Sequence, residues 1–278
     1  MASLATLSSA KATLIRDLLR HRKARDAAQT FVIEGMKPIR ELLRTQARSV
    51  EAIVVTSHCL DKSEPGLRRA LEQGPAPIYI CRQQVFDKIS DVQTPAGILA
   101  VVRQPRWNQE EIFRQPSVFG LYGESLQDPA NVGAIIRTAA AFGLDGVWLS
   151  ADSADVFNPK VVRATAGTLL TLPIFSVTSG GRFGAHSVVA FARNDCALLV
   201  ADPSSKRSRD IRQITRIPVR TILAFGNESR GLSEATDKQA ALRFHIPVSR
   251  AVDSLNVAAS AAIAMFYFSR LPRQGASP

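Results

Sequence analysis

Apolar runs and amphipathic segments alternate along the first hundred residues. Residues 10–30 place Ile15, Leu18 and Leu19 on one helical face, opposite a basic face. Short apolar runs follow, separated by further amphipathic segments, and this alternation is typical of a small α/β unit. The expected strands are residues 31–33, 52–56, 78–81 and 98–103, and the expected helices are residues 10–30, 38–48, 64–73 and 83–90.

The alternation restarts after a polar segment that is bounded by prolines. Residues 106–116 are interpreted as a linker, since a new apolar run begins directly afterwards at residue 118; an ordinary surface loop is the alternative. The predicted domains are therefore residues 1–105 and residues 117–278. In the second domain the expected strands are residues 118–122, 147–149, 197–201, 221–225 and 244–248, the expected helices are residues 129–142, 158–170 and 255–268, and residues 204–216 are expected to form a mobile basic loop.

Polar residues collect where the last predicted strands end and the last helix begins. Asn227 and Glu228 follow the apolar run 221–225, which stops at Gly226. Asp253 or Ser254 can cap the final helix. Polar groups at strand ends and at a helix N-terminus are the usual ligand position in an α/β domain. The alternative is a buried strand pair and a core helix with ordinary caps.

Charge suggests a polyanionic partner. The 278 residues carry 35 Lys+Arg against 24 Asp+Glu, a net charge of +11 with a pI of about 10.2. Such an excess favours nucleic acid over a merely solvated basic surface. This makes RNA or DNA the expected partner class.

Cysteine and histidine usage narrows the chemistry. Cys59, Cys81 and Cys196 are far apart and predict free thiols in a reducing, cytoplasmic compartment. The four histidines are equally scattered, so neither a metal site nor a Cys/His nucleophile pair is expected. No apolar run reaches the roughly 18 to 20 residues of a membrane span. The N-terminus faintly resembles a transit peptide, but the helical pattern that starts near residue 14 indicates that it belongs to the fold.

Three ordered motifs resemble those of a known enzyme family. Residues 131–139 read Asn-Val-Gly-Ala-Ile-Ile-Arg-Thr-Ala, residues 226–233 read Gly-Asn-Glu-Ser-Arg-Gly-Leu-Ser, and residues 246–248 read Ile-Pro-Val ahead of Ser-Leu-Asn-Val-Ala at 254–258. Together they resemble the SpoU (TrmH-type) RNA ribose 2′-O-methyltransferases of the SPOUT superfamily. Residues 31–37 and 94–101 more weakly resemble that family's RNA substrate-binding domain, a small α/β unit related to ribosomal RNA-binding proteins.

This resemblance implies a parallel sheet whose C-terminal part forms a trefoil knot. It also implies bound S-adenosylmethionine and a homodimer whose active sites use both chains. By motif position, the residues expected to hold the cofactor are Gly226, Asn227, Ile246 and Leu255, and those expected in the active site are Asn131, Arg137, Glu228, Ser254 and Asn256. Ser229 and the pair Ser249-Arg250 depart from common glycines of the family, but neither departure removes a reacting group.

The chemistry sets a role for each active-site residue. A ribose 2′-OH must lose a proton as it attacks the sulfonium methyl, and no metal is needed. A guanidinium is a poor base, so Arg137 is expected to hold the ribose or its phosphate and acidify the hydroxyl; a phosphate clamp alone is the alternative. Asn131 and Glu228 would position that arginine, or else serve only as a helix N-terminal residue and a structural ion pair. Ser254 and Asn256 would cap the last helix while lining the pocket.

Rival functions remain open at this stage. A Rossmann-type methyltransferase would need a Gly-x-Gly-x-x-Gly-like loop after residues 118–122, where the sequence has none. A non-catalytic RNA-binding protein on the same fold is a second alternative. Ribosomal RNA is the preferred substrate, and transfer RNA is the runner-up. The residues expected to contact RNA are Arg16, Arg20, Arg22, Lys23 and Lys37.

Overall fold

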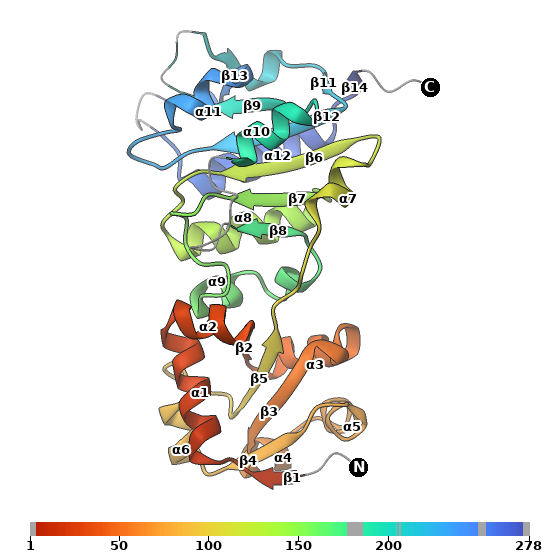
Figure 1. Ribbon diagram of the computed structural model, residues 1–278, viewed down its shortest axis with the longest axis vertical. Coiled ribbons are helices and arrows are strands. Elements are labelled where there is room, and N and C mark those ends of the chain that lie inside the picture. The colour runs from red at the N-terminus through yellow and green to blue at the C-terminus, as the bar shows by residue number, and fades with distance from the viewer. Residues whose placement is uncertain (1–3, 177–185, 204, 206, 250–253, 275–278) are drawn as a thin grey trace. The chain divides into compact units, whose positions relative to one another are not determined.

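The computed structural model describes residues 4–176, 186–203, 205, 207–249 and 254–274 (Figure 1). The chain divides into two compact units. Unit 1 comprises residues 1–106 and 157–170, and unit 2 comprises residues 107–156 and 171–278.

Unit 1 contains a mixed five-stranded sheet in the order β1-β4-β3-β5-β2. β5 runs antiparallel to both β2 and β3, whereas β3, β4 and β1 are mutually parallel. The N-terminal strand β1 was not expected from the sequence, and it pairs with β4 from Leu4 to Thr6. The strands are β1 (Leu4–Thr6), β2 (Thr30–Glu34), β3 (Val50–Thr56), β4 (Ile78–Cys81) and β5 (Ile98–Arg103).

The helices of unit 1 bury their apolar stripes against this sheet. Ile15 and Leu18 of α1 lie in one core cluster with Leu99 and Val101 of β5. The helices are α1 (Ser9–Arg20), α2 (Arg22–Ala28), α3 (Met36–Thr45), η1 (Ala47–Ser49), α4 (Ser57–Asp61), α5 (Pro65–Gln73), α6 (Gln83–Lys88), α9 (Pro159–Ala164) and η2 (Thr168–Leu170).

The single basic helix predicted at residues 10–30 is wrong. His21 adopts an extended conformation (φ −123°, ψ 119°), which separates α1 from α2. Arg25 of α2 is only 3% exposed, and its Nη1 donates to the carbonyl oxygen of Leu18 at 2.6 Å. This buried guanidinium satisfies a free carbonyl at the end of α1, so the break between the helices is fixed by a charge-assisted hydrogen bond.

The helix predicted at residues 158–170 is also shorter than expected. α9 ends at Ala164, because Ala166 (φ 49°) and Gly167 (φ 93°) take left-handed conformations that stop the helix. The segment packs with unit 1, where the ring of Phe157 lies 5.0 Å from that of Phe31 on β2. Residues 157–170 were expected within the second domain, and by their contacts they belong to the first unit.

Unit 2 is built on a seven-stranded sheet in the order β10-β13-β9-β12-β6-β7-β8, with every pair parallel. Parallel strands covered on both faces need continuous apolar sequence, and residues 221–225 of β12 are all buried. The short strands β11 and β14 form a separate parallel pair. The strands are β6 (Val118–Gly123), β7 (Gly146–Leu149), β8 (Ile174–Ser176), β9 (Ala197–Ala201), β10 (Arg209–Asp210), β11 (Ile217–Pro218), β12 (Arg220–Phe225), β13 (Ala240–His245) and β14 (Arg273–Gln274).

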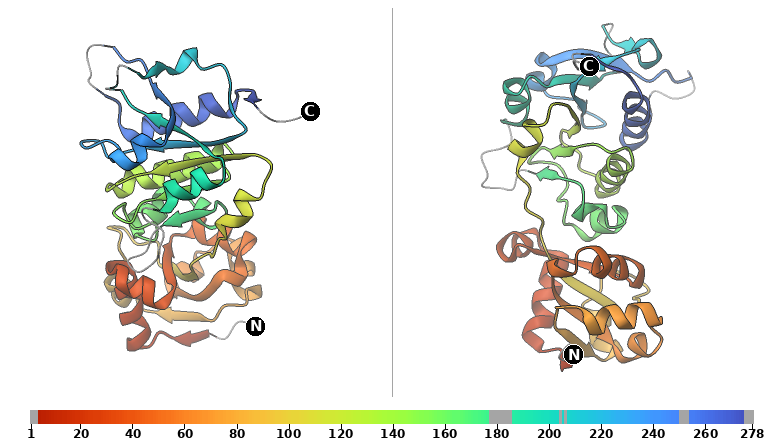
Figure 2. Two further views of the ribbon diagram at one scale, coloured as in Figure 1. Left: turned by 45° about the horizontal axis from the view of Figure 1, so that its top comes forward. Right: turned by 90° about the vertical axis from the view of Figure 1, so that its right-hand side faces the viewer.

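Helices cover both faces of the seven-stranded sheet. α8 and α12 pack side by side on one face, and α10 packs on the other (Figure 2). The α10 face holds an aromatic cluster in which Trp148 stacks on Phe113 with ring centroids 5.7 Å apart. The helices are α7 (Gln109–Phe113), α8 (Pro129–Ala141), α10 (His186–Arg193), η3 (Ile211–Gln213), α11 (Glu234–Lys238) and α12 (Val257–Ser269).

Three other elements differ from the sequence prediction. Residues 106–116 contain α7, whose Ile112 and Phe113 are buried in the unit 2 core, so this segment is packed structure rather than a free linker. The strand expected at residues 244–248 is instead β13, which ends at His245 before Pro247. Its early part escaped prediction because the polar Arg243 interrupts the apolar run of residues 240–244. Residues 209–213 form β10 and η3 within the expected mobile loop.

Arg220, at the start of β12, joins three segments of unit 2. Its guanidinium donates to the carbonyl oxygens of Asn194 (2.8 Å), Gln115 (2.6 Å) and Phe113 (2.9 Å). Carbonyls that follow α7 and α10 are thereby satisfied at the amino end of the central strand. One side chain therefore holds both helix ends against the sheet.

We expect Arg220→Met to lower the free energy of unfolding by about 2–4 kcal/mol, because three carbonyls lose a charged donor. Urea unfolding monitored by circular dichroism measures this change. Arg193→Met, which alters an exposed arginine of α10, is the matched control and should leave the midpoint nearly unchanged. Equal midpoints for the two variants would refute the assigned role of Arg220.

Candidate cofactor pocket and active site

A pocket of about 680 Å³ lies at the carboxyl ends of three neighbouring parallel strands. Its lining comprises residues 200–203 at the end of β9, 225–232 at the end of β12, and Phe244, His245, Ile246 and Val248 at the end of β13, together with Asp237, residues 254–257 and Ser260. We call it the strand-end pocket. Because parallel strands end at one edge of a sheet, loops that are distant in sequence meet there.

Gly226 permits the tight fold of the loop that follows β12. A Cβ atom at this position would lie 2.3 Å from the carbonyl carbon and oxygen of Gly231, closer than any real contact allows. Asn227 and Gly231 exchange backbone hydrogen bonds of 3.0 and 2.8 Å across the loop, and Gly231 has a φ of +68°. Gly226 therefore allows the backbone at Gly231 to come close, and Gly231 adopts the positive φ that the turn needs.

Asn227 holds this loop from both sides. Its side-chain oxygen accepts from the backbone N–H groups of Ser229 (2.9 Å) and Arg230 (3.1 Å). Its Nδ2 donates to the carbonyl oxygen of Ser125, in the loop after β6, at 3.0 Å. The pocket wall is thus tied to the neighbouring strand end by a side chain that was expected to bind cofactor.

Glu124 makes a second tie between the same strand ends. Its carboxylate accepts from the N–H (2.9 Å) and Oγ (2.8 Å) of Ser233 and from Oγ1 of Thr236 (3.1 Å), at the start of α11. Burial, followed by the negative charge of Glu124, raises the pKa of the adjacent Tyr122. The tyrosine therefore stays neutral, as a packed side chain of the core.

A chain of amide hydrogen bonds joins all three sequence motifs. Asn131 Nδ2, on α8, donates to Glu228 Oε1 at 2.7 Å. Asn131 Oδ1 accepts from Asn256 Nδ2 at 2.9 Å. Asn131 is only 9% exposed, and both ends of its amide are satisfied, so its orientation is fixed. We call this chain Glu228–Asn131–Asn256 the amide relay.

Asn256 also caps the last helix. Its Oδ1 accepts from the N–H groups of Ala258 (2.9 Å) and Ala259 (3.2 Å), and α12 begins at Val257. The expectation that Asn256 caps this helix is therefore confirmed. The same expectation for Ser254 is wrong, because Ser254 precedes the helix by three residues, and Asp253, another expected cap, lies outside the described residues. Asn256 therefore both caps α12 and takes part in the amide relay.

The structure brings most of the predicted site residues together. Those that line the strand-end pocket are Gly226, Asn227, Glu228, Ile246, Ser254, Leu255 and Asn256. Asn131 joins them through the amide relay. Arg137 does not: it lies two turns further along α8, is exposed, and is not among the residues that line the pocket.

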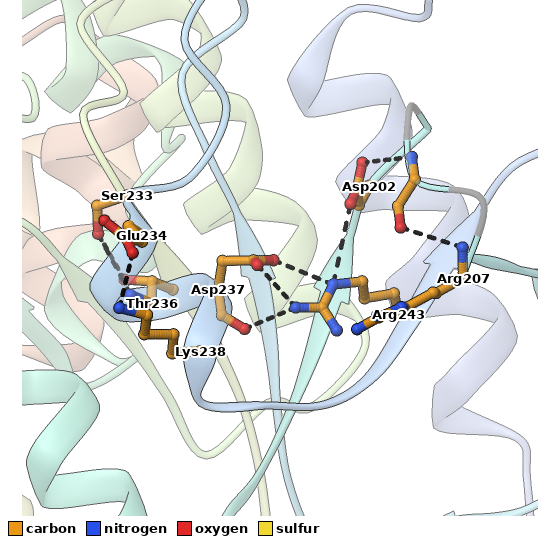
Figure 3. A network of polar contacts seen from close by, with 9 residues as sticks. Asp202, Arg207, Ser233, Glu234, Thr236, Asp237, Lys238 and Arg243 are labelled. Atoms are coloured by element: carbon orange, nitrogen blue, oxygen red, sulfur yellow. Dashed lines mark hydrogen bonds and ion pairs between the residues drawn. The ribbon is translucent and has the colours of Figure 1, made fainter.

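Three polar residues of this region were missed. Asp202 and Asp237 line the pocket, and Arg243 of β13 lies between them (Figure 3). The Arg243 guanidinium donates to Asp237 Oδ1 (3.0 Å) and Oδ2 (2.7 Å), and this carboxylate raises the pKa of Arg243. Only Asp202 carried a sequence signal, because it directly follows the predicted strand 197–201.

The residues predicted to contact RNA lie on three helices of unit 1. Arg16 and Arg20 of α1, Lys23 of α2 and Lys37 of α3 are exposed. Arg22 is half-buried and forms an ion pair with Asp26 at 3.6 Å. Of the basic residues predicted on α1 and α2, Arg16, Arg20 and Lys23 are therefore exposed and available to RNA. Arg22 and the buried Arg25 make contacts within unit 1.

The three cysteines are not among the residues that line the strand-end pocket. Cys59, Cys81 and Cys196 are all unpaired and buried, and burial raises the pKa of each thiol. Across the described residues, no group of three or more His, Cys, Asp and Glu side chains could hold a metal ion. Over the same part of the chain, no helix is long and apolar enough to cross a membrane.

Comparison with known proteins finds two family models that match this chain. Residues 119–266, more than half of the chain, match the SpoU rRNA Methylase family. Residues 15–100 match the MRM3-like substrate binding domain.

Similar proteins match nearly the whole chain. The 23S rRNA (guanosine(2553)-2'-O)-methyltransferase RlmP of Bacillus subtilis is 28% identical over 94% of this chain and 98% of its own length. An uncharacterized tRNA/rRNA methyltransferase of Synechocystis is 29% identical over 99% of this chain and 96% of its own. The crystal structure of the SpoU methyltransferase AviRb from Streptomyces viridochromogenes with bound AdoMet (S-adenosylmethionine) has a TM-score of 0.81 at 25% identity, covering 95% of this chain and 98% of that chain.

We expect Gly226→Ala to abolish the rise in melting temperature that S-adenosylmethionine gives the unchanged protein, because the new methyl group displaces the backbone at Gly231. Thermal denaturation with and without the cofactor measures this. Gly66→Ala, at a site where a Cβ meets nothing within 4 Å, is the control and should keep the full shift. A normal shift for Gly226→Ala would show that the loop can move without cost to binding.

Proposed function

The chain belongs to the SpoU rRNA Methylase family and is an S-adenosylmethionine-dependent RNA 2′-O-methyltransferase, and from that premise we propose that it methylates ribosomal RNA at the strand-end pocket. The observation that carries the assignment of the site is the amide relay. It joins one residue from each of the three motifs through hydrogen bonds of 2.7 and 2.9 Å, beside the pocket.

The residues around the pocket fit the cofactor. A volume of about 680 Å³ suits a molecule of this size. Gly226, Ile246 and Leu255 line the wall, where their backbone groups would hold the cofactor, and the acidic Asp202 and Asp237 also line it, although Asp237 is paired with Arg243. When bound, S-adenosylmethionine supplies an electrophilic methyl group on a sulfonium.

The amide relay would hold the groups that surround the reacting ribose. Glu228 accepts from Asn131, which leaves the rest of its carboxylate to orient a donor on the substrate side. Asn256 fixes the start of α12, and Ser254 lies on the pocket wall just before it. Arg137 would bind the ribose or its phosphate and favour loss of the 2′-OH proton through its positive charge, since a guanidinium is a poor base.

The exposed position of Arg137 is accounted for if two chains form each active site. α12 is apolar almost all round, yet Ile263 (40%) and Phe266 (45%) on its outer face are exposed. This face continues onto α8, where Phe142 contacts Phe266 with ring centroids 5.8 Å apart. We propose that a second copy covers it and that each copy lends Arg137 to the other's pocket. The trefoil knot implied by the resemblance stays a prediction.

Unit 1 would supply RNA recognition. It matches a substrate-binding domain, and exposed basic residues of α1 and α2 can contact phosphates. The sequence relatives named for 23S rRNA favour ribosomal RNA over transfer RNA. Three unpaired buried thiols agree with a reducing compartment, so we propose that the protein acts in the cytoplasm.

The proposed function is tested by incubating the protein with labelled S-adenosylmethionine and, separately, with unmodified 23S rRNA, 16S rRNA and transfer RNA. We expect label in ribosomal RNA, on a ribose whose 3′ phosphodiester resists alkali because the adjacent 2′-oxygen is methylated. Label in transfer RNA alone would overturn the assignment of ribosomal RNA as the substrate. Cofactor binding without label in free RNA or in ribosomal particles would leave a non-catalytic RNA-binding protein.

We expect Arg137→Ala to lower kcat at least about 100-fold, because the group that polarises the hydroxyl is lost. The dissociation constant for S-adenosylmethionine should stay within twofold, since Arg137 is proposed to contact the ribose or its phosphate and not the cofactor. Single-turnover methylation and cofactor titration measure the two quantities. Arg193→Ala is the control, and activity within a few-fold for Arg137→Ala would rule out its proposed role.

We expect Arg16→Gln combined with Arg20→Gln to weaken RNA binding and to reduce the slope of log affinity against log salt concentration by about 1.4–1.8. Filter binding over a salt series measures the slope. Arg40→Gln combined with Arg44→Gln is the control, because those arginines are paired with Glu64 and Glu41. An unchanged slope for the α1 variant would remove this helix from RNA binding.

A further inference from the structure

A second basic segment lies on unit 2, next to the strand-end pocket. Residues 207–216 contain four arginines and a single acidic residue. That residue, Asp210, is bound by Arg212, whose Nε donates to both carboxylate oxygens at 3.0 Å. The other three arginines, Arg207, Arg209 and Arg216, are exposed. The segment therefore presents an excess of positive charge to solvent.

The segment starts at the pocket wall. Asp202, which lines the pocket, accepts from the N–H of Ser205 at 3.1 Å, and Ser205 Oγ accepts from the N–H of Arg207 at 3.1 Å (Figure 3). β10 then runs parallel to β13, with Arg209 opposite Phe244 and Asp210 opposite His245. Phe244 and His245 also line the pocket. Adjacent strands lie about 4.8 Å apart, so the backbone of Arg209 lies next to the pocket wall, and Arg207 is joined to the same wall through Ser205 and Asp202.

The same segment is anchored, unlike the mobile loop expected from its composition. Ile211 (3% exposed) and Ile214 (5%) are buried. Tyr267 of α12 donates through its hydroxyl to the carbonyl oxygens of Arg212 (3.3 Å) and Ile214 (3.1 Å). An anchored backbone lowers the entropic cost of holding a ligand with its arginines.

We propose that Arg207 and Arg209 form a phosphate-binding rim that holds the RNA backbone beside the target nucleotide. The proposal rests on the proposed function, because it takes the strand-end pocket as the place of methyl transfer. The occupant is single-stranded RNA: arginines bind phosphate through paired hydrogen bonds, and a ribose can enter a pocket only where the strand is unpaired. The rim would thus complement unit 1 by gripping the nucleotides next to the reacting one.

Edge protection of the sheet is the competing explanation. β10 is the outermost strand of the seven-stranded sheet, and charged residues on edge strands prevent pairing with other chains. This role requires only a charge or polarity at the edge and predicts no effect on RNA affinity. The two explanations are separable by measuring RNA binding and self-association on the same variants.

The deciding variant is Arg207→Gln combined with Arg209→Gln. We expect the KM for RNA to rise about tenfold and the salt slope of RNA binding to fall by about 1.4. The dissociation constant for S-adenosylmethionine and the kcat at saturating RNA should stay within twofold. Arg114→Gln combined with Arg193→Gln removes equal charge from exposed positions of the same unit and should change neither the KM nor the slope. Arg207→Lys combined with Arg209→Lys should keep most of the slope.

An unchanged KM and salt slope for the glutamine pair would overturn the rim. A glutamine pair that self-associates while its RNA affinity is unchanged would instead assign these arginines to edge protection. The binding measurements need no methyl transfer, so they test phosphate binding by Arg207 and Arg209 even if no RNA is methylated. Absence of methyl transfer by the unchanged protein, in contrast, would count against the proposed function.

Discussion

The amide relay is the constraint on which the site depends. Asn131 can donate to Glu228 and accept from Asn256 only if the start of α8, the loop after β12 and the start of α12 meet within hydrogen-bond distance. An amide that is 9% exposed is costly to leave unpaired, so the relay penalises any arrangement in which one of the three segments is displaced. Gly226 allows the middle segment to fold tightly enough to take part.

The parallel sheet brings these segments to one edge. β9, β12 and β13 are adjacent and parallel, so their following loops must emerge side by side. Because both faces of this sheet are covered, its strands can be almost wholly apolar, and the polar chemistry is confined to strand ends and helix starts. The opposite end of the sheet has a structural role instead, and there Arg220 ties α7 and α10 to β12.

Charge is sorted in a way that matches a cationic cofactor and a polyanionic substrate. Three acidic residues, Asp202, Asp237 and Glu228, line the pocket, together with one arginine, Arg230. Other exposed basic groups lie outside it, among them those on α1 and α2 of unit 1 and at residues 207–216 of unit 2. A protein with a net charge of +11 thus has more acidic than basic residues where a sulfonium would bind, and exposed basic groups where phosphates would pass. Arg243 limits the negative charge of the wall by pairing with Asp237.

The sequence by itself determined the α/β class, the strands β6, β7, β9 and β12 of the larger sheet, and the pocket residues that belong to the three motifs. Strong apolar runs such as residues 118–122 and 221–225 predicted their strands because burial on both faces leaves a local signal. The three motifs identified the site because each is a short run of residues that can be read directly from the sequence.

Only the tertiary structure decided what depends on distant partners. The break at His21, the packing of α7 and the bounds of β13 follow from contacts with other elements, so no local pattern revealed them. The amide relay likewise spans residues 131 to 256, and its hydrogen bonds exist only once the sheet has brought those segments together. Arg137 gives a further example. The sequence identified it by its position in the first motif, but only the folded structure showed that it lies outside the pocket. Chemistry carried by one segment can be predicted from the chain, but chemistry made by the meeting of segments depends on the packing energy that unites them.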